Sequence, residues 1–169
     1  MAHNLNIKAD GKAAFAFTGE KPWHGLGIGV PGQMSVREAL VAGGCDFTVD
    51  SRPLEAPALE CVDANGKLSM IAKVEVPGLR LNVRRDTNQA LGVVSDKYVI
   101  VQNVEAFGAL ESMFGPGAAC VDTVGALGKG ERVFICAKMP EVAEIVPGDE
   151  VSSYLVITTG HDGSHAVQV

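Results

Sequence analysis

The chain has 169 residues, 47% of them hydrophobic, which is enough apolar material for the core of one ordinary domain. Fourteen basic against twenty acidic residues give a formal net charge of −6, which argues against wholesale attraction to nucleic acid or to an anionic membrane. No apolar run approaches the roughly 20 residues that span a bilayer, and the N-terminus lacks the features of a secretion signal. The four cysteines are far apart in the sequence, so we expect free thiols and a cytoplasmic location.

Residues 1–20 are expected to form an N-terminal arm, and residues 21–169 a single domain. The first predicted element in this domain is a short helix over about 35–43. Ser35 and Glu38 have the spacing of a capping box, in which each side chain bonds the backbone N–H of the other residue. Gly43-Gly44 then ends the helix.

Two runs with strand periodicity follow, over about 46–56 and 67–76, joined across residues 63–66. Pro77-Gly78 is expected to break the second run.

The next predicted hairpin pairs residues 79–84 with residues 90–95. Its first strand alternates between apolar and polar side chains, so we expect Leu79, Leu81 and Val83 to point inward. By the same alternation, Arg80, Asn82 and Arg84 should point outward.

The main helix is predicted over 103–114, with Asn103 as its N-cap and Gly115-Pro116-Gly117 at its end. Two further hairpins should pair residues 120–126 with 131–139 and residues 152–159 with 164–169. Hairpins, a helix and more hairpins indicate an α+β fold, in which an antiparallel hairpin-rich sheet is packed by one main and one short helix. Because the last predicted strand reaches the final residue, we expect a C-terminal continuation to be missing.

Two glycine-rich segments resemble phosphate-binding loops only formally. Residues 27–32 match G-x-G-x-x-G, but no convincing strand precedes them, Pro31 removes an N–H group, and the helix starts only at Ser35. Residues 125–130 lack the spacing of a P-loop. No cofactor is therefore expected.

Three histidines are the candidate metal ligands, and none of them is a strong one. His161 and His165 are four residues apart, but a predicted turn places them on separate strands, so exposed turn histidines are the simpler interpretation. His24 has two open interpretations: a structural histidine hydrogen-bonded beside Trp23, which packs over the sheet edge, or part of a site. No nucleophile, base or carboxylate pair has a recognisable catalytic spacing, so we expect no enzyme activity.

The segment 80–97 is the only one with a positive balance, four basic against two acidic residues. Guanidinium groups two residues apart on a strand are about 7 Å from each other, close to the phosphate spacing of a nucleic-acid strand. Tyr98 adds a surface on which a base can stack. The alternative is a solvated sheet face that protects an edge from aggregation.

Four blocks of sequence resemble a family of phage- and plasmid-related proteins known as a domain of unknown function. They are Lys21-Pro-Trp-His-Gly-Leu-Gly27, Gly92-Val-Val-Ser-Asp-Lys-Tyr98 with Val101-Gln-Asn103, Leu127-Gly-Lys-Gly-Glu-Arg132, and Tyr154-Leu-Val-Ile-Thr-Thr-Gly-His-Asp-Gly163. The resemblance implies a mobile-element context and no particular chemistry. The V-C-x-N-T block that follows in this family is absent here.

A more distant similarity is to ring-forming single-strand DNA-annealing proteins, which hold DNA on a basic groove around an oligomeric ring. This resemblance implies a DNA-binding protein of phage or plasmid recombination, an oligomeric annealing module that performs no covalent chemistry and does not act at a membrane. The residues expected to contact single-stranded DNA are Arg80, Asn82, Arg84, Arg85, Lys97, Tyr98, Lys129 and Arg132. The alternative is a protein-binding factor of a mobile element, such as an inhibitor of host defence, for which an acidic surface is favourable.

Overall fold

A computed structural model describes residues 4–57, 60–62, 64–70, 73–114, 120–146 and 149–169. These residues form an α+β fold, as predicted, with three sheets. The elements in chain order are β1 (Phe15–Phe17), β2 (Ile28–Gly29), α1 (Val36–Gly43), β3 (Val49–Ala56), β4 (Glu60–Val62), β5 (Leu68–Met70), β6 (Val74–Arg84), β7 (Gln89–Ser95), α2 (Asn103–Phe114), β8 (Cys120–Leu127), β9 (Arg132–Val146) and β10 (Asp149–Gly160).

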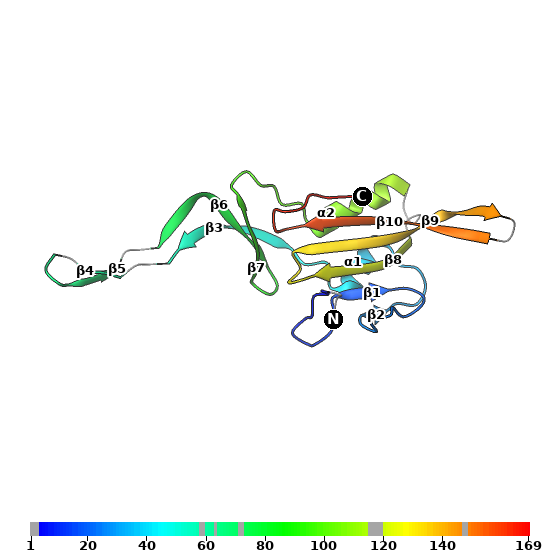
Figure 1. Ribbon diagram of the computed structural model, residues 1–169, viewed down its shortest axis with the longest axis horizontal. Helices are drawn as coiled ribbons and strands as arrows, with labels where there is room; N and C mark the ends of the chain where they lie inside the picture. Colours follow the sequence, from blue (N-terminus) through cyan, green and yellow to red (C-terminus); the bar gives the residue numbers. More distant parts are fainter. Residues whose placement is uncertain (1–3, 58–59, 63, 71–72, 115–119, 147–148) are drawn as a thin grey trace.

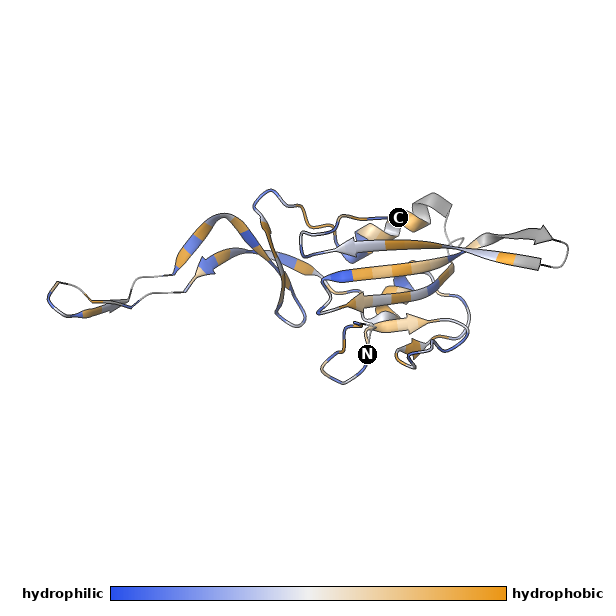
Figure 2. Ribbon diagram, in the orientation of Figure 1, coloured by the Kyte–Doolittle hydropathy of each residue, from blue (hydrophilic) through white to orange (hydrophobic). Residues whose placement is uncertain are grey.

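The core of the protein is a five-stranded sheet with the order β10-β9-β8-β1-β2. Its neighbouring strands are antiparallel, except that β1 and β2 are parallel. Both helices pack on this sheet, α1 against β1 and β8, and α2 against β10. The buried side chains between helices and sheet include Leu40, Phe107, Leu110, Val124 and Ile135. Figure 2 shows the matching concentration of hydrophobic residues along the middle of β8 and β9.

A second, smaller cluster is built on β1. Phe15 and Phe17 alternate with Ala16, which belongs to the main cluster, so β1 is buried on both faces. Leu5 and Ala13 pack in the second cluster, and Leu26 packs against it. Part of the segment expected to be an N-terminal arm is therefore a strand of the core sheet, and residues before it are also buried.

The protein is elongated because a long hairpin projects from the core (Figure 1). We call residues 49–95 the arm. It consists of a three-stranded sheet with the order β3-β6-β7 and a two-stranded hairpin, β4 and β5, at its far end. The far ends of β9 and β10 extend from the opposite side of the core (Figure 1).

Both predicted helices are confirmed, with one change at an N-terminus. Ser35 caps α1 in a full capping box with Glu38, and Gly44 ends it in the left-handed conformation. In α2 the cap is Gln102, whose N–H donates to Glu105 Oε2 at 3.1 Å and whose carbonyl accepts from Ala106. Asn103 was expected as the cap, but its side chain is buried in the core and bonds elsewhere. No helix of the described residues is long and apolar enough to cross a membrane.

Two of the four predicted hairpins are formed as expected, β6 with β7 and β8 with β9. In the arm, β4 pairs with β5 and residues 55–56 pair with 74–75, but Pro77 and Gly78 lie inside β6 instead of ending a strand. The left-handed Gly78 lies where the β3–β6 register shifts, so the breaker residues produce an irregularity in a continuous strand. The helix end at 115–117 and residue 63 of the predicted turn lie outside the described residues.

The last predicted hairpin is wrong in its pairing. β10 pairs along its length with β9, and residues 164–169 return only to a single bridge between Thr158 and Gln168. The reason lies in residues 160–165, which we call the junction loop. His161 N–H donates to Glu131 O, which extends the β10–β9 ladder by one residue beyond Gly160 and Arg132. The buried His161 side chain contacts Asn103 at the start of α2, which holds the loop against the helix and away from a tight turn back along β10.

Candidate functional site

The arm joins the core through the polar face of β6, which is the reverse of the expected orientation. Asn82 is 0% exposed and Arg84 is 3% exposed, so the prediction that they point outward is wrong. Leu79, which was expected to point inward, is exposed, and so is Val93, the cross-strand partner of Leu81. Val83, which was expected to point inward, is buried as predicted at 3% exposed, and the register with β7 shifts between Asn82 and Val83. Strand alternation therefore misassigned Asn82 and Arg84 but not Val83.

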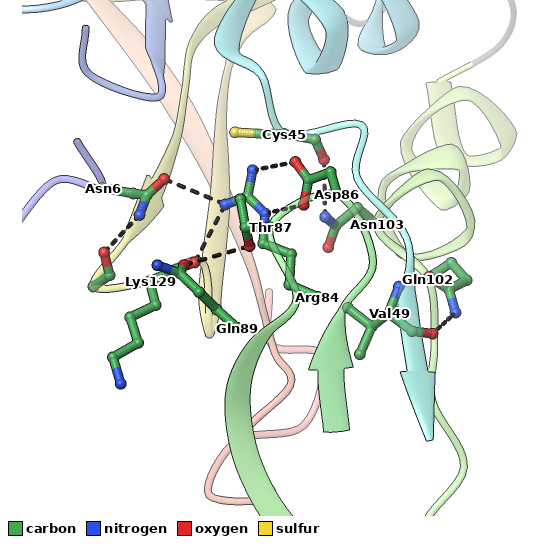
Figure 3. A network of polar contacts seen from close by, with 11 residues as sticks. Asn6, Cys45, Val49, Arg84, Asp86, Thr87, Gln89, Gln102, Asn103 and Lys129 are labelled. Carbon is green, nitrogen blue, oxygen red and sulfur yellow. Dashed lines mark hydrogen bonds and ion pairs between the residues drawn. The ribbon is translucent and has the colours of Figure 1, made fainter. Parts of the chain in front are cut away.

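Arg84 is the centre of a polar network between arm and core (Figure 3). Its Nε and Nη2 donate to the two carboxylate oxygens of Asp86 at 2.7 and 2.9 Å. Its Nη1 donates to Asn6 Oδ1 at 3.3 Å and to Lys129 O at 3.2 Å. The guanidinium carbon lies 3.8 Å from the ring centroid of Phe47, a cation–π contact. Arg84 thus links the arm to the N-terminal segment and to the β8–β9 turn.

The ion pair with Arg84 also sets the charge state of Asp86. Partial burial is the largest single influence and opposes ionisation of this carboxyl, but the hydrogen bonds and charge of Arg84, together with backbone N–H donors at residues 86 and 87, outweigh it and hold the pKa of Asp86 below its usual value. Because four of its five N–H donors are used inside the protein and the side chain is 3% exposed, Arg84 is a structural residue and is poorly placed to meet a phosphate.

A second polar chain runs from the arm through the junction loop to the helices. Asn82 Nδ2 donates to His161 O at 2.8 Å. His161 Nε2 lies 2.8 Å from Asn103 Oδ1, and Asn103 Nδ2 donates to Cys45 O at 2.8 Å. Since the Asn103 amide donates to Cys45, its oxygen must accept, which assigns the proton of His161 to Nε2.

His161 was expected to be an exposed turn residue, but it is 1% exposed. Desolvation lowers its pKa to about 4, although the charge of Asp162 acts in the opposite direction. The imidazole is therefore neutral at pH 7. Its Nδ1 and the Oδ1 of Asn82 are buried acceptors without a hydrogen-bond partner among the described residues.

The junction loop is surrounded by side chains from separate parts of the sequence. Tyr98 OH donates to Gly160 O at 3.0 Å. Arg132 Nε lies 3.9 Å from Asp162 Oδ2, a loose ion pair. Gly92 lies against the backbone of Asp162, where a Cβ at position 92 would be 2.5 Å from Asp162 Cα. The loop therefore brings together two of the predicted DNA-binding residues, Tyr98 and Arg132, which are far apart in the sequence.

Two cavities flank this loop and share His165 in their linings. One, of about 270 Å³, is lined by Tyr98, Val99 and Val101 on one side and by residues 163–167 on the other. The second, of about 250 Å³, contains Arg132, Phe134, Thr158 and Gln168. Each is about large enough for one small planar group. We call the junction loop and these two cavities the candidate site.

The remaining predicted contact residues lie around the arm and the β8–β9 turn. Lys97 and Lys129 are exposed. Lys97 precedes Tyr98 in the sequence, and the carbonyl oxygen of Lys129 is itself one of the acceptors of Arg84. Arg80 is half-buried and bonds Ser51 through Nε at 2.7 Å, so it lies across the sheet. Arg85 is exposed and forms a bidentate pair with Asp50 at 2.7 and 3.1 Å. The eight predicted residues therefore do not form one surface.

The described residues contain no group of three or more side chains suited to a metal ion. His24 lies on the turn before β2, against Phe15, whereas His161 is sealed inside the junction loop. At the rim of the loop, Ser164 Oγ lies 2.6 Å from His165 Nδ1 and 2.7 Å from both Asp162 carboxylate oxygens. The Ser164 hydroxyl therefore lies between the His165 ring and the Asp162 carboxylate. In a catalytic triad the histidine lies between the serine and the carboxylate. This cluster holds the loop's shape and lacks the order of groups that activates a nucleophile.

Trp23 is the feature that the sequence interpretation missed most clearly. It was expected to pack over the sheet edge, yet it is 82% exposed. The neighbouring His24 does form the expected local hydrogen bond, since its Nδ1 accepts from Leu26 N–H at 3.1 Å.

The comparisons with known proteins concern the second half of the chain. A family model described as a domain of unknown function (DUF932) matches residues 90–169. This stretch contains the junction loop, α2 and strands β8 to β10, whereas most of the arm and the turn with Trp23 precede it. No curated protein and no solved structure matches the chain significantly. The part of the protein that carries the candidate site is thus similar to a domain of unknown function.

Proposed function

We propose that this protein binds single-stranded DNA without covalent chemistry, as an annealing module in phage or plasmid recombination. The observation that supports this proposal is the convergence on the junction loop. Tyr98 and Arg132 come from separate segments and contact the same loop, Tyr98 at Gly160 and Arg132 at Asp162. Two cavities of base-like size open beside them.

Fewer residues contact DNA in this proposal than in the prediction from sequence, because several of the predicted residues are buried or paired. Lys97 beside Tyr98, Lys129 on the β8–β9 turn and Arg132 beside Asp162 are exposed and are the phosphate contacts of this proposal. The pair between Arg132 and Asp162 is long and partly solvated, so it exchanges at little cost when a phosphate approaches. Asn82 and Arg84 hold the loop and arm in place instead of touching DNA.

A salt-titrated binding assay with fluorescently labelled single-stranded DNA tests this function. Arg132→Ala and Lys97→Ala should each weaken binding and lower the slope of log affinity against log salt by about 0.7. Lys138→Ala is the matched control, because Lys138 is also an exposed cation of β9 but lies farther along the strand, opposite Cys120. No detectable binding at low salt would sink the proposal.

A closed oligomer belongs to the same proposal, since an annealing module has to present a long strand with its bases exposed. The mass of the full chain in solution tests this part. A ring of defined stoichiometry is expected, and a monomer at every concentration and with DNA present would rule out ring-type annealing.

The second candidate function is that of a protein-binding factor of a mobile element, such as an inhibitor of host defence. It is favoured by exposed apolar side chains on the arm, where Val62, Leu68 and Val74 project from the strands around the far hairpin. Replacing Val62 and Leu68 by Ser distinguishes the two functions. If the first proposal holds, the double variant should bind single-stranded DNA with the affinity of the parent. If the second holds, the double variant should lose the binding of the protein partner, and neither protein should bind the DNA.

A further inference from the structure

Trp23 is in an environment that is unusual for a tryptophan. It is the only tryptophan of the chain and is 82% exposed. Tryptophan carries a large apolar ring system and is highly buried on average, so exposing it forgoes a substantial hydrophobic gain. Among the described residues its ring contacts that of the adjacent His24, at 5.5 Å between centroids and an interplanar angle of 73°.

The turn that carries this ring, residues 21–27, is held in one conformation from below. Gly25 N–H donates to Pro22 O at 2.9 Å, and Leu26 N–H donates to His24 Nδ1 at 3.1 Å. The His24 ring stands edge-on to the buried Phe15, with centroids 5.1 Å apart. Trp23 is therefore exposed on a supported turn and not on a loose loop.

The close approach of this turn to the core requires glycine at position 27. Gly27 has φ of 98°, and a Cβ there would lie 2.5 Å from a ring carbon of Phe15. Gly25, with φ of 69°, leaves room for Lys21, whose Nζ would be 3.9 Å from a Cβ at position 25. The glycines of the segment thus seat the turn on Phe15 and bring a lysine close to it.

Two lysines and a cavity lie near the turn that carries the exposed ring. The turn forms one wall of a cavity of about 280 Å³, with Gly25–Ile28 on one side and Gly11–Ala13, including Lys12, on the other. Neither Lys12 nor Lys21 forms an ion pair with a carboxylate of the described residues, and Asp10 nearby accepts from the backbone N–H of Lys12. The lining of this cavity holds no acidic side chain.

An exposed aromatic ring flanked by lysines matches the requirements of an unpaired nucleotide. A base stacks on an aromatic face whatever its sequence, while ammonium groups neutralise the phosphates on either side. A protein hot spot, by contrast, is typically a tryptophan inside a well-packed apolar patch, and the neighbours here are mostly glycine, proline and lysine.

We propose that Trp23 is a stacking platform for an unpaired base of single-stranded DNA, with Lys12 and Lys21 contacting the adjacent phosphates. This site rests on the proposed DNA-binding function but is separate from the junction loop. It extends the bound strand to a part of the chain that precedes the stretch similar to the domain of unknown function.

The single tryptophan gives a direct readout of this proposal. The full chain is titrated with an end-labelled oligothymidylate while tryptophan emission and label anisotropy are followed together. Stacking should quench the emission with the same saturation curve as the anisotropy change. Trp23→Ala should weaken binding by about 5- to 150-fold, whereas Trp23→Phe should retain most of the affinity because the ring remains. Lys21→Ala should lower the salt slope by about 0.7.

Three other outcomes overturn the inference. If anisotropy reports binding while emission stays constant and Trp23→Ala binds as the parent does, the stacking site is wrong and DNA binding elsewhere stands. If neither signal changes at low salt, both the site and the proposed function fail. If Trp23→Ala lowers the mass of the protein in solution but not its DNA affinity, the ring contacts a second copy of the chain instead of a base. Duplex DNA of the same length is the probe control, and it should not quench, because its bases are already stacked.

Discussion

Two regions of this molecule depart from the usual rule that polar side chains are exposed and apolar ones buried, and they depart from it in opposite directions. In the junction between arm and core, Asn82 and Arg84 are polar and buried, whereas on the turn before β2 Trp23 is apolar and exposed. The buried pair bonds to fixed backbone carbonyls of His161 and Lys129. In the part of the chain that the structure describes, the ring contact of Trp23 is with the neighbouring histidine.

The difference shows how to separate structural from partner-facing residues. Hydrogen bonds to fixed acceptors offset the cost of burying a polar side chain, so Arg84, with its four bonds, and Asn82, through its bond to His161 O, act within the fold. An apolar ring held in water by a rigid turn contributes little to that stability. We therefore expect the junction to control folding and the tryptophan turn to control binding.

The largest expected effect comes from removing Arg84. Arg84→Ala deletes the cation–π contact with Phe47 and leaves Asp86 and Lys129 O without their donor. The free energy of unfolding should fall by about 3 kcal/mol, measured by urea denaturation. Arg85→Ala is the matched control, since its ion pair with Asp50 is on the surface, and its midpoint should stay near that of the parent. Equal effects of the two variants would show that Arg84 does not hold the junction.

A pH effect of similar or slightly smaller size should come from His161. Burial lowers its folded pKa from 6.5 to about 4, so between these values the unfolded chain binds a proton that the folded chain does not. Stability should accordingly fall as the pH falls from 6.5 to 4, by up to about 3 kcal/mol. His161→Gln should be less stable at pH 7 but should lose this part of the slope, because its amide can donate to Asn103 without titrating. A variant with the parent's slope would contradict a buried neutral histidine.

A smaller effect is expected from crowding the contact between arm and loop. In Gly92→Ala the new methyl group would lie 2.5 Å from Asp162 Cα and 2.7 Å from its carbonyl oxygen. The backbone must shift, so the free energy of unfolding should fall by about 1–3 kcal/mol in thermal or urea denaturation. Gly108→Ala, in α2 with open space around the added group, should instead gain about 0.5–1 kcal/mol. If Gly92→Ala proves as stable as the parent, the arm does not rest on the loop at this point.

The smallest expected effect on stability belongs to Trp23. Trp23→Ala should change the free energy of unfolding by no more than about 0.5 kcal/mol, because the ring covers little of the core. Phe15→Leu, directly beneath the same turn and buried, is the control and should shift the urea midpoint measurably. A clear loss of stability in Trp23→Ala would mean that the ring supports the turn, and the contrast with the junction would disappear.

Much of the fold was predictable because its signals are local. The capping box of Ser35 and Glu38, the apolar spacing of 103–114 and the glycine turn at 128–130 act within a few residues of themselves. The corresponding elements, α1, α2 and the β8–β9 hairpin, are present. The bounds of α1, α2 and β8 agree with the prediction to within one residue, whereas β9 continues to Val146, beyond the predicted end at residue 139. The sequence also singled out Tyr98, Arg132 and His161, three residues of the candidate site or its loop.

The sequence alone could not assign the faces of β6. Alternation groups Arg80, Asn82 and Arg84 together, but either face can meet the core if acceptors are available there. Those acceptors are the carbonyls of Lys129 and His161, 45 and 79 residues away in the chain. Asn103 was likewise interpreted as a local cap, because nothing near it in sequence indicates that His161 and Cys45 O would become its partners.

The amino-acid sequence by itself determined the α+β class, the two helices and the β6–β7 and β8–β9 hairpins, since capping, periodicity and turn chemistry depend on neighbours. Only the tertiary structure decided which polar residues are buried and that the single tryptophan is exposed. Burial depends on contacts between segments far apart in the chain. The arm's polar face became structural because the junction loop offers it hydrogen-bond acceptors, and Trp23 remained in solvent because no segment of the described chain covers it.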